Sequence, residues 1–202
     1  MKKNTEMTKW KLCQGYFSLI ESNLKDEITF DDLIFVSKVS NKDAEKIISK
    51  NSKDYNFIFL KILISKLDTQ TLYEFKIDIN EDIVSNTYEK ILEGLTLRFE
   101  SFLPYRQSFK ILSQSLNVKA QNFLRLLKKN CSFVSNLLDI VEGRQNQTPK
   151  ALKSIALNIV FLKAVNIFLT EKGNSLDSTI RSLDKDLRDF EDLGQMLGII
   201  KN

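Results

Sequence analysis

Two opposite charges flank a phenylalanine in an otherwise apolar segment: Arg98 and Glu100 stand on either side of Phe99. Such a pair can orient a polar group of a ligand, or it can be two ordinary exposed charges. The sequence has no histidine, which excludes imidazole metal sites and histidine-based acid–base catalysis. Cys13 and Cys131 are too few for a metal cluster. With no nucleophile–base pair and no phosphate loop, we expect no enzyme, metal or cofactor.

Composition favours an all-α fold. The 202 residues include only 2 Pro and 6 Gly, so few residues favour the tight turns that separate strands and close hairpins. This length fits one or two domains with a sizeable core. The net charge of +4 permits a polyanionic partner without arguing for one.

The cysteines, the N-terminal segment and the most apolar stretch indicate the cellular compartment that we expect for the protein. The two cysteines are far apart and offer no disulfide framework, so a reduced, cytoplasmic setting is the simplest expectation. The N-terminal MKKNTEMTKWKLCQGYF has a basic start but no continuous apolar core, which argues against a signal peptide. The apolar stretch 155–169 is interrupted by Asn158, Lys163 and Asn166, and we predict no transmembrane segment there.

The stretch from Thr29 to Lys50 carries two helix-start signals eleven residues apart. Thr29 is followed three residues later by Asp32, and Ser40 by Asp43. In each, a hydroxyl can accept a free backbone N–H of the first turn, and the acid suits the helix dipole. Two very short helices separated by about three residues have the shape of a helix-turn-helix. They also fit two short helices of an ordinary all-α domain, since this motif has a real false-positive rate.

Hydrophobic spacing and capping residues predict about nine helices. Besides the short pair, they are expected over residues 8–23, 52–68, 81–103, 104–117, 117–142, 150–171 and 176–197. Residues 68–80 are predicted to be a loop or helix end. The chain then divides into a helix-turn-helix domain, 1–51, and a second helical domain, 52–202.

The last two predicted helices carry more apolar surface than one neighbour can cover. The ninth has apolar residues at gaps of three and four, a nearly heptad seam suited to pairing with another helix. We therefore predict a homodimer with two-fold symmetry. Its interface is predicted to contain Leu152, Ile155, Ile159, Leu162, Asn166, Ile180, Leu183, Leu187 and Phe190.

The segment Thr29-Phe30-Asp31-Asp32-Leu33 resembles the threonine and apolar helix start found in the TetR/AcrR family of bacterial transcriptional regulators. Val39-Ser40 stands at its Gly-Val-Ser turn, with Lys38 in place of the glycine. Further on, Leu97-Arg98-Phe99-Glu100, Pro104-Tyr105-Arg106, Lys150-Ala151-Leu152 and Ser182-Leu183-Asp184-Lys185 are similar to an alphaproteobacterial branch.

The resemblance implies a cytoplasmic, homodimeric DNA-binding regulator. A helix inserted in the major groove reads bases with its N-terminal half, which here contains Asn41 and Lys42. Asparagine can read adenine, and lysine can reach guanine acceptors. Lys46 lies one turn on, and Thr29 and Lys38 are implied to lie near phosphates.

The family also holds a small ligand among its fourth to eighth helices. The candidate lining is mostly phenylalanine, of which the sequence has 14. It consists of Phe99, Phe102, Phe109, Phe123, Leu127, Phe133, Phe161 and Phe168. An aromatic stripe of this kind is also typical of a filled core, and both interpretations stand.

Two alternatives belong to other classes. A lipid-binding accessory family of ubiquinone biosynthesis has a similar architecture with a degenerate helix-turn-helix, which would make the chain a carrier of an isoprenoid or acyl lipid. The third alternative is a helical interaction protein with neither ligand nor DNA.

Overall fold

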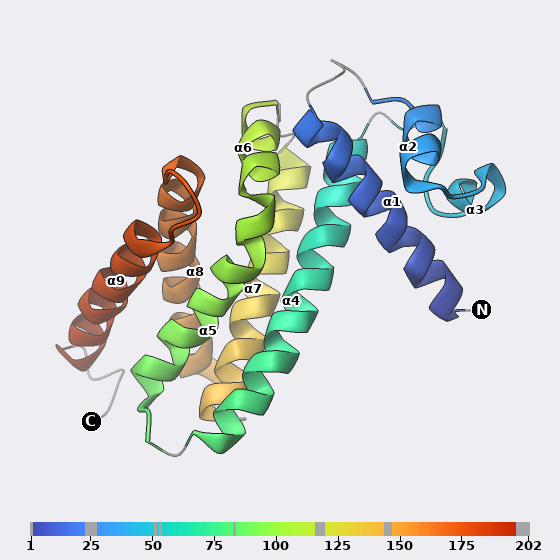
Figure 1. Cartoon of the computed structure of the whole chain (residues 1–202). Helices are drawn as coiled ribbons and strands as arrows, with labels where there is room; N and C mark the ends of the chain where they lie inside the picture. The colour runs from blue at the N-terminus through green and yellow to red at the C-terminus, as the bar shows by residue number, and fades with distance from the viewer. Residues whose placement is uncertain are drawn as a thin grey trace. The chain divides into compact units, whose positions relative to one another are not determined.

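The computed structural model describes residues 2–22, 28–50, 52, 54–82, 84–115, 120–143 and 147–196. Over these residues the fold is all-α, as predicted, and none of them lies in a strand (Figure 1). The elements in chain order are α1 (Lys2–Ser22), α2 (Phe30–Ser37), α3 (Asn41–Glu45), α4 (Tyr55–Glu81), α5 (Thr87–Phe102), η1 (Leu103–Tyr105), α6 (Arg106–Ser115), α7 (Ala120–Glu142), α8 (Gln147–Thr170) and α9 (Asp177–Met196).

The chain forms two compact units. The first contains Met1–Lys66 and Gln107–Val118, and the second contains Leu67–Arg106 and Lys119–Asn202. Helix α4 contributes to both units, and α6 begins in the second and continues in the first. The predicted boundary after residue 51 falls inside the first unit. As a division between two functions, it stays a prediction.

In the first unit, α1 packs against α2 and α3. Residues of α1 at helical spacing, Cys13, Tyr16 and Phe17, are almost fully buried and supply one wall of the core. Phe59 of α4 is also fully buried, and its ring stacks on Tyr16 at 4.6 Å between centroids. The Cys13 thiol donates to the Phe59 carbonyl at 3.6 Å, and burial raises the pKa of Cys13 to about 12. This cysteine is therefore an inert core residue.

Residues 68–80 continue α4 as an unbroken helix to Glu81, so the prediction of a loop or helix end over this segment is wrong. Asp68, Thr71 and Phe75, at gaps of three and four, are all buried, and Phe75 is fully so. Phe75, Ile77 and Ile79 alternate with polar residues, a pattern that is typical of extended segments. In the structure Ile77 is exposed, because burial of one helical face outweighs the local alternation.

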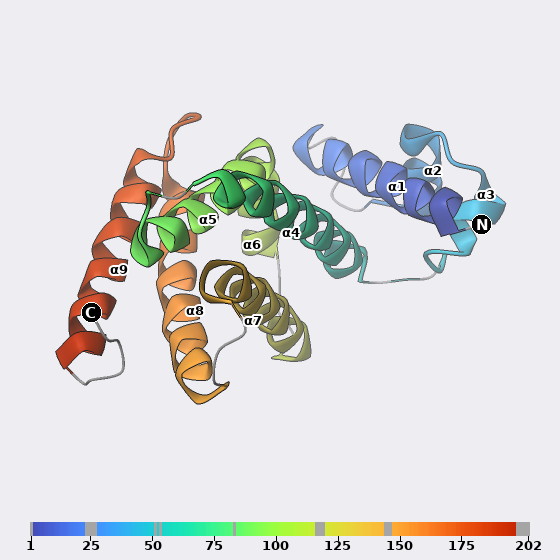
Figure 2. The same ribbon diagram turned by 90° about the horizontal axis from the view of Figure 1, so that it is seen from below.

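In the second unit, α8 packs between α7 and α9, and α5 contacts both α7 and α9 (Figure 2). Residues Lys150–Thr170 of α8 are long and apolar enough to cross a membrane, with a mean hydropathy of 1.7, and 33% of that window is buried. The absence of a transmembrane segment at residues 155–169 therefore stays a prediction. Core helices of soluble proteins meet the same criterion, and it assigns no location.

Candidate functional site

The first turn of α2 is closed by reciprocal hydrogen bonds between Thr29 and Asp32. The Thr29 hydroxyl accepts from the Asp32 backbone N–H at 3.2 Å, and the Asp32 carboxylate accepts from the Thr29 N–H at 3.0 Å. The hydroxyl also donates to the same carboxylate at 2.6 Å. This capping box confirms the predicted helix start. Thr29 is exposed, as a phosphate contact requires, but its hydroxyl is already engaged with an acid.

The turn between α2 and α3 consists of Lys38, Val39 and Ser40. Lys38 has a left-handed backbone, φ 52° and ψ 39°, and an exposed side chain, while Val39 is buried. Ser40 caps α3 by accepting from the Asp43 N–H at 3.2 Å. A left-handed residue with a Cβ costs about 1 kcal/mol, so the surrounding packing holds Lys38 in this conformation. The turn is therefore tight with a lysine, not a glycine, at its left-handed position.

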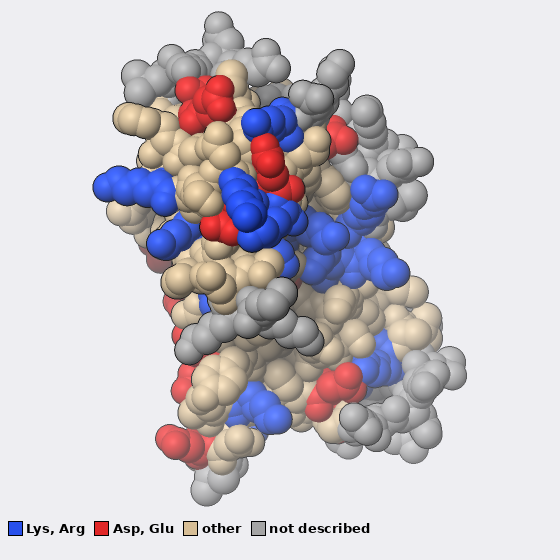
Figure 3. All heavy atoms as spheres, turned by 90° about the vertical axis from the view of Figure 1, so that its right-hand side faces the viewer, with Lys and Arg blue, Asp and Glu red and all other residues tan. Residues whose placement is uncertain are grey.

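Helix α3 presents its first two residues to solvent, because Asn41 and Lys42 are both exposed. Lys46 is paired with Asp43 at 2.7 Å, and Lys50 with Glu45 at 3.0 Å. Hydrogen bonds from Lys46 and Ser40 lower the pKa of Asp43. Figure 3 shows acidic side chains directly beside basic ones on this side of the molecule. The basic character of α3 is therefore partly neutralised by its own acids.

The predicted ligand-lining residues divide into three groups. Five are buried in the second unit, where Phe99 stacks on Phe161 at 4.9 Å and lies 5.2 Å from Phe168, centroid to centroid. Leu127 is half-buried, and Phe109 is half-buried in the segment that belongs to the first unit. The side chain of Phe123 lies outside the described residues. The buried five are Phe99, Phe102, Phe133, Phe161 and Phe168.

Arg98 occupies the space between these rings. Its guanidinium carbon lies 4.0 Å from the centroid of Phe133 and 4.4 Å from that of Phe161, and the residue is only 2% exposed. Its Nε and Nη2 donate to the two carboxylate oxygens of Asp68, at 2.8 and 3.0 Å. Burial raises the pKa of Asp68, and the charge and hydrogen bonds of Arg98 oppose that rise. The geometry is that of a buried, bidentate ion pair.

The polar chain continues from Arg98 through α7 to α8. Arg98 Nη1 donates to the Asn130 side-chain oxygen, Asn130 donates to Asn158 at 2.5 Å, and Asn158 donates to the Ser154 carbonyl at 2.6 Å. Four helices, α4, α5, α7 and α8, are thus joined by side chains that satisfy one another. Such a network gives the unit one specific packing.

Neither sequence interpretation of Arg98 and Glu100, a buried pair or two exposed charges, describes the structure, because only Arg98 is buried. Glu100 is exposed, and the carboxylate that pairs with Arg98 belongs to Asp68, thirty residues earlier. Sequence reasoning placed Asp68 at the junction of a predicted helix with a loop or helix end, and treated Asn158 only as an interruption of an apolar stretch. A polar residue inside an apolar helix is a signal of a buried hydrogen bond, and it could have identified Asn158.

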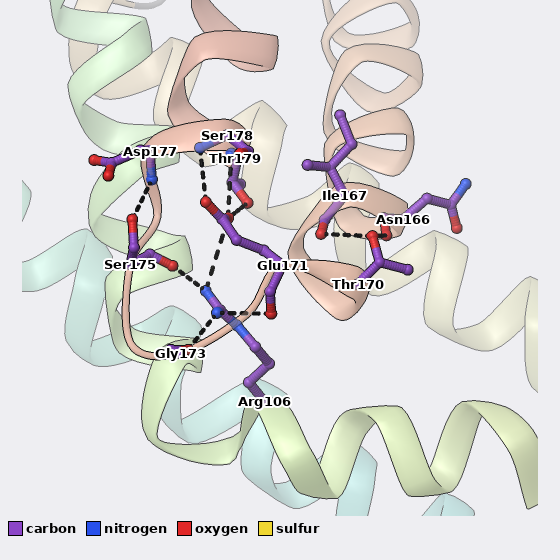
Figure 4. Close-up of polar contacts among 10 residues, drawn as sticks. All are labelled: Arg106, Asn166, Ile167, Thr170, Glu171, Gly173, Ser175, Asp177, Ser178 and Thr179. Carbon is purple, nitrogen blue, oxygen red and sulfur yellow. Dashed lines mark hydrogen bonds and ion pairs between the residues drawn. The ribbon is translucent and has the colours of Figure 1, made fainter.

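A second buried arginine, Arg106, reaches into the turn between α8 and α9 (Figure 4). Its Nη1 donates to the carbonyls of Glu171 and Gly173 at 3.3 and 2.9 Å, and its Nη2 to that of Ser175 at 2.7 Å. The guanidinium also lies 4.6 Å from the Phe168 centroid. Gly173 has φ 69°, a left-handed conformation that glycine adopts without strain. We call this arrangement the Arg106 clasp.

Glu171 supports the clasp from the other side. Its carboxylate accepts from the backbone N–H groups of Ser178 and Thr179 at 2.7 and 3.3 Å, and from the Thr179 hydroxyl at 2.6 Å. Burial by itself would raise the pKa of Glu171, but these hydrogen bonds and the charge of Arg106 outweigh it and lower the pKa. A charged side chain thereby caps the first turn of α9.

The predicted dimer residues separate by helix. On α8 the side chains are exposed: Leu152 by 49%, Ile155 by 59%, Ile159 by 63% and Leu162 by 38%, with Asn166 also exposed. On α9, Leu183 and Leu187 are buried within the chain, and Ile180 and Phe190 are half-buried. The α9 seam is therefore largely covered from within the chain, so Leu183 and Leu187 are not available to a second copy. The exposed α8 residues remain candidates.

Among the described residues, no group of three or more Cys, Asp or Glu side chains could hold a metal ion. Comparison of the sequence with protein-family models gave no match, and comparisons with curated proteins and with solved structures gave none either.

Proposed function

We propose that the chain is a TetR-like, DNA-binding transcriptional regulator that acts as a homodimer. The observation that carries the proposal is the turn at Lys38. Two capped helices, α2 and α3, are joined by three residues with one left-handed position, and the second helix begins with exposed Asn41 and Lys42. This arrangement suits a helix whose N-terminal end meets base edges in the major groove.

Charge supports a weak, salt-sensitive contact with DNA. Neither Lys38 nor Lys42 has an ion-pair partner in the part of the chain that the structure describes, and both are exposed. Lys46 must leave Asp43 before it can meet a phosphate. We therefore expect Lys42 to contribute more than Lys46, and we expect a modest affinity overall.

The experiment is binding to DNA selected from a random pool, measured over a range of salt concentrations. Lys42→Ala should weaken binding to every sequence and flatten the salt slope by about 0.9 if it meets one phosphate. Asn41→Ala should instead change the preferred sequence, because base contacts specify and phosphate contacts position. Lys61→Ala, an exposed lysine on α4, is the matched control and should change neither. Failure to select any sequence at low salt would refute the regulator.

A homodimer would bring two such helices to one DNA site. The α8 stripe, defined as Leu152, Ile155, Ile159, Leu162 and Asn166, has gaps of three, four, three and four residues. That spacing is the heptad pattern of paired helices, and an asparagine within it can fix their register. Exposed apolar residues in such a row are typical of an interface.

The assembly is tested by size measurement in solution at micromolar concentration. Wild type should be a dimer, and Ile159→Lys should make it a monomer, since the substitution places a charge at the centre of the stripe. Tyr73→Lys is the matched control, because Tyr73 is 68% exposed on α4, outside the stripe. A monomeric wild type would exclude this interface.

A small apolar effector or a bound lipid would have to enter the second unit among the five buried phenylalanines. Arg98 already fills the space between Phe133 and Phe161, which favours a packed interior over a lipid chamber. Native mass spectrometry of protein isolated from cells separates these cases. An isoprenoid or acyl lipid that accompanies the chain would support the lipid carrier instead of the regulator.

A further inference from the structure

The guanidinium of Arg98 lies in a site to which three other helices of the second unit contribute. Asp68 of α4 accepts hydrogen bonds from Nε and Nη2, at 2.8 and 3.0 Å, and Asn130 of α7 accepts one from Nη1. The ring centroids of Phe133, on α7, and Phe161, on α8, lie 4.0 and 4.4 Å from the guanidinium carbon. Carboxylates that accept two parallel hydrogen bonds and aromatic rings are the groups that recognise a guanidinium in proteins.

Much of this site is held in place by contacts that do not involve Arg98. The Asn130 amide nitrogen donates to the side-chain oxygen of Asn158 at 2.5 Å, and Asn158 donates to a backbone carbonyl of α8 at 2.6 Å. These two bonds leave the Asn130 oxygen to accept from the guanidinium. The Phe161 ring is stacked on Phe99, with 4.9 Å between centroids. An acceptor and a ring of the site are therefore preorganised.

We propose that the second unit contains a guanidinium-binding site, which the chain fills with its own Arg98. An apolar ligand in place of this side chain would leave Asp68, which is only 8% exposed, buried without its cation. A buried charge that loses its partner is strongly unfavourable. Burial raises the pKa of Asp68, and the charge of Lys129 opposes that rise less strongly than the charge of Arg98. A ligand of this site must therefore bring a guanidinium group of its own.

The test removes the side chain and supplies its missing part from solution. Arg98→Ala removes the two outer methylenes and the guanidinium, and ethylguanidinium contains those same atoms. At ten times its Kd, ethylguanidinium should raise the Tm of this variant by about 3–6 °C. Ethylammonium has the charge without the planar fork and should bind at least about tenfold more weakly. Ethylurea is planar but neutral, and it should leave the Tm unchanged because Asp68 stays unpaired.

Three further proteins serve as controls. Arg181→Ala removes an exposed arginine of α9 in the same unit, and ethylguanidinium should leave its Tm unchanged. Wild type should not respond at the concentration that saturates Arg98→Ala, because Arg98 already fills the site. The double variant Arg98→Ala with Asp68→Asn lacks the carboxylate that accepts the two parallel bonds, so its preference for ethylguanidinium over ethylammonium should disappear.

Equal responses of Arg98→Ala to ethylguanidinium and ethylammonium, or no response to either, would overturn the proposal. A preference for ethylguanidinium that survives Asp68→Asn would also overturn it. If Arg98→Ala is unfolded without ligand, recovery of the helical circular dichroism signal replaces the Tm as the measurement, and failure to recover counts as no response.

The proposed site goes beyond the proposed regulator, and its measurements contain no DNA. A chain whose Arg98→Ala variant binds ethylguanidinium, but which selects no DNA sequence, would refute the regulator and support the site. A chain that selects DNA, but whose Arg98→Ala variant ignores ethylguanidinium, would do the reverse.

Discussion

The two units use charged residues in opposite ways. In the first unit, the lysines of the α2–α3 region are exposed, and where they pair, they pair with acids three to five residues away. In the second unit, Arg98 and Arg106 are buried and bind groups that are distant in sequence. Exposed pairs contribute little to stability, while a buried charge must be matched completely. The first unit thus keeps the lysines of its α2–α3 region at the surface, and the second unit uses Arg98 and Arg106 to fix its own packing.

The largest test of this comparison is the removal of Arg98. Arg98→Met keeps much of the side-chain volume but leaves Asp68 buried without its cation, and we expect a loss of about 3–5 kcal/mol in the free energy of unfolding. The double variant Arg98→Met with Asp68→Leu should recover most of that loss, because no unpaired charge remains. Lys42→Ala in the first unit should stay within about 0.5 kcal/mol of wild type. Urea denaturation measures all three.

A double variant as unstable as the sum of its two single variants would contradict this account of Arg98. In that case packing around the guanidinium, and the bond to Asn130, would be the dominant contributions. A large loss of unfolding free energy in Lys42→Ala would contradict the expectation for the first unit, because it would show that this exposed lysine stabilises the fold.

The sequence predicted the first unit better than the second because the determinants of the first unit are local. A helix cap needs a hydroxyl or carboxylate within three residues, so Thr29 and Ser40 could be identified directly, and both caps are confirmed. The same reasoning cannot find a partner thirty residues away. The Asp68–Arg98 pair therefore appeared as one charge at the start of a predicted loop or helix end and another beside Glu100.

The α9 seam shows a second limit. Spacing at three and four residues establishes that Leu183 and Leu187 share an apolar face, but not which surface covers it. In the structure that face is buried within the chain, and the uncovered face lies on α8 instead. Periodicity predicts that a helix is buried on one side, and only tertiary structure distinguishes an internal neighbour from a second copy.

The smallest expected change in stability concerns Lys38 of the first unit. This residue has both an exposed charge and a strained backbone. Its left-handed conformation, φ 52°, is easier for glycine, so Lys38→Gly should raise the free energy of unfolding by up to about 1 kcal/mol. Lys42→Gly is the matched control: it places glycine inside α3, where backbone entropy should lower stability by about 1 kcal/mol. If Lys38 also meets a phosphate, Lys38→Gly should weaken DNA binding while it stabilises the fold. This opposite response would show that the lysine is kept for its charge despite the strain, whereas unchanged DNA affinity would remove Lys38 from the proposed contact surface.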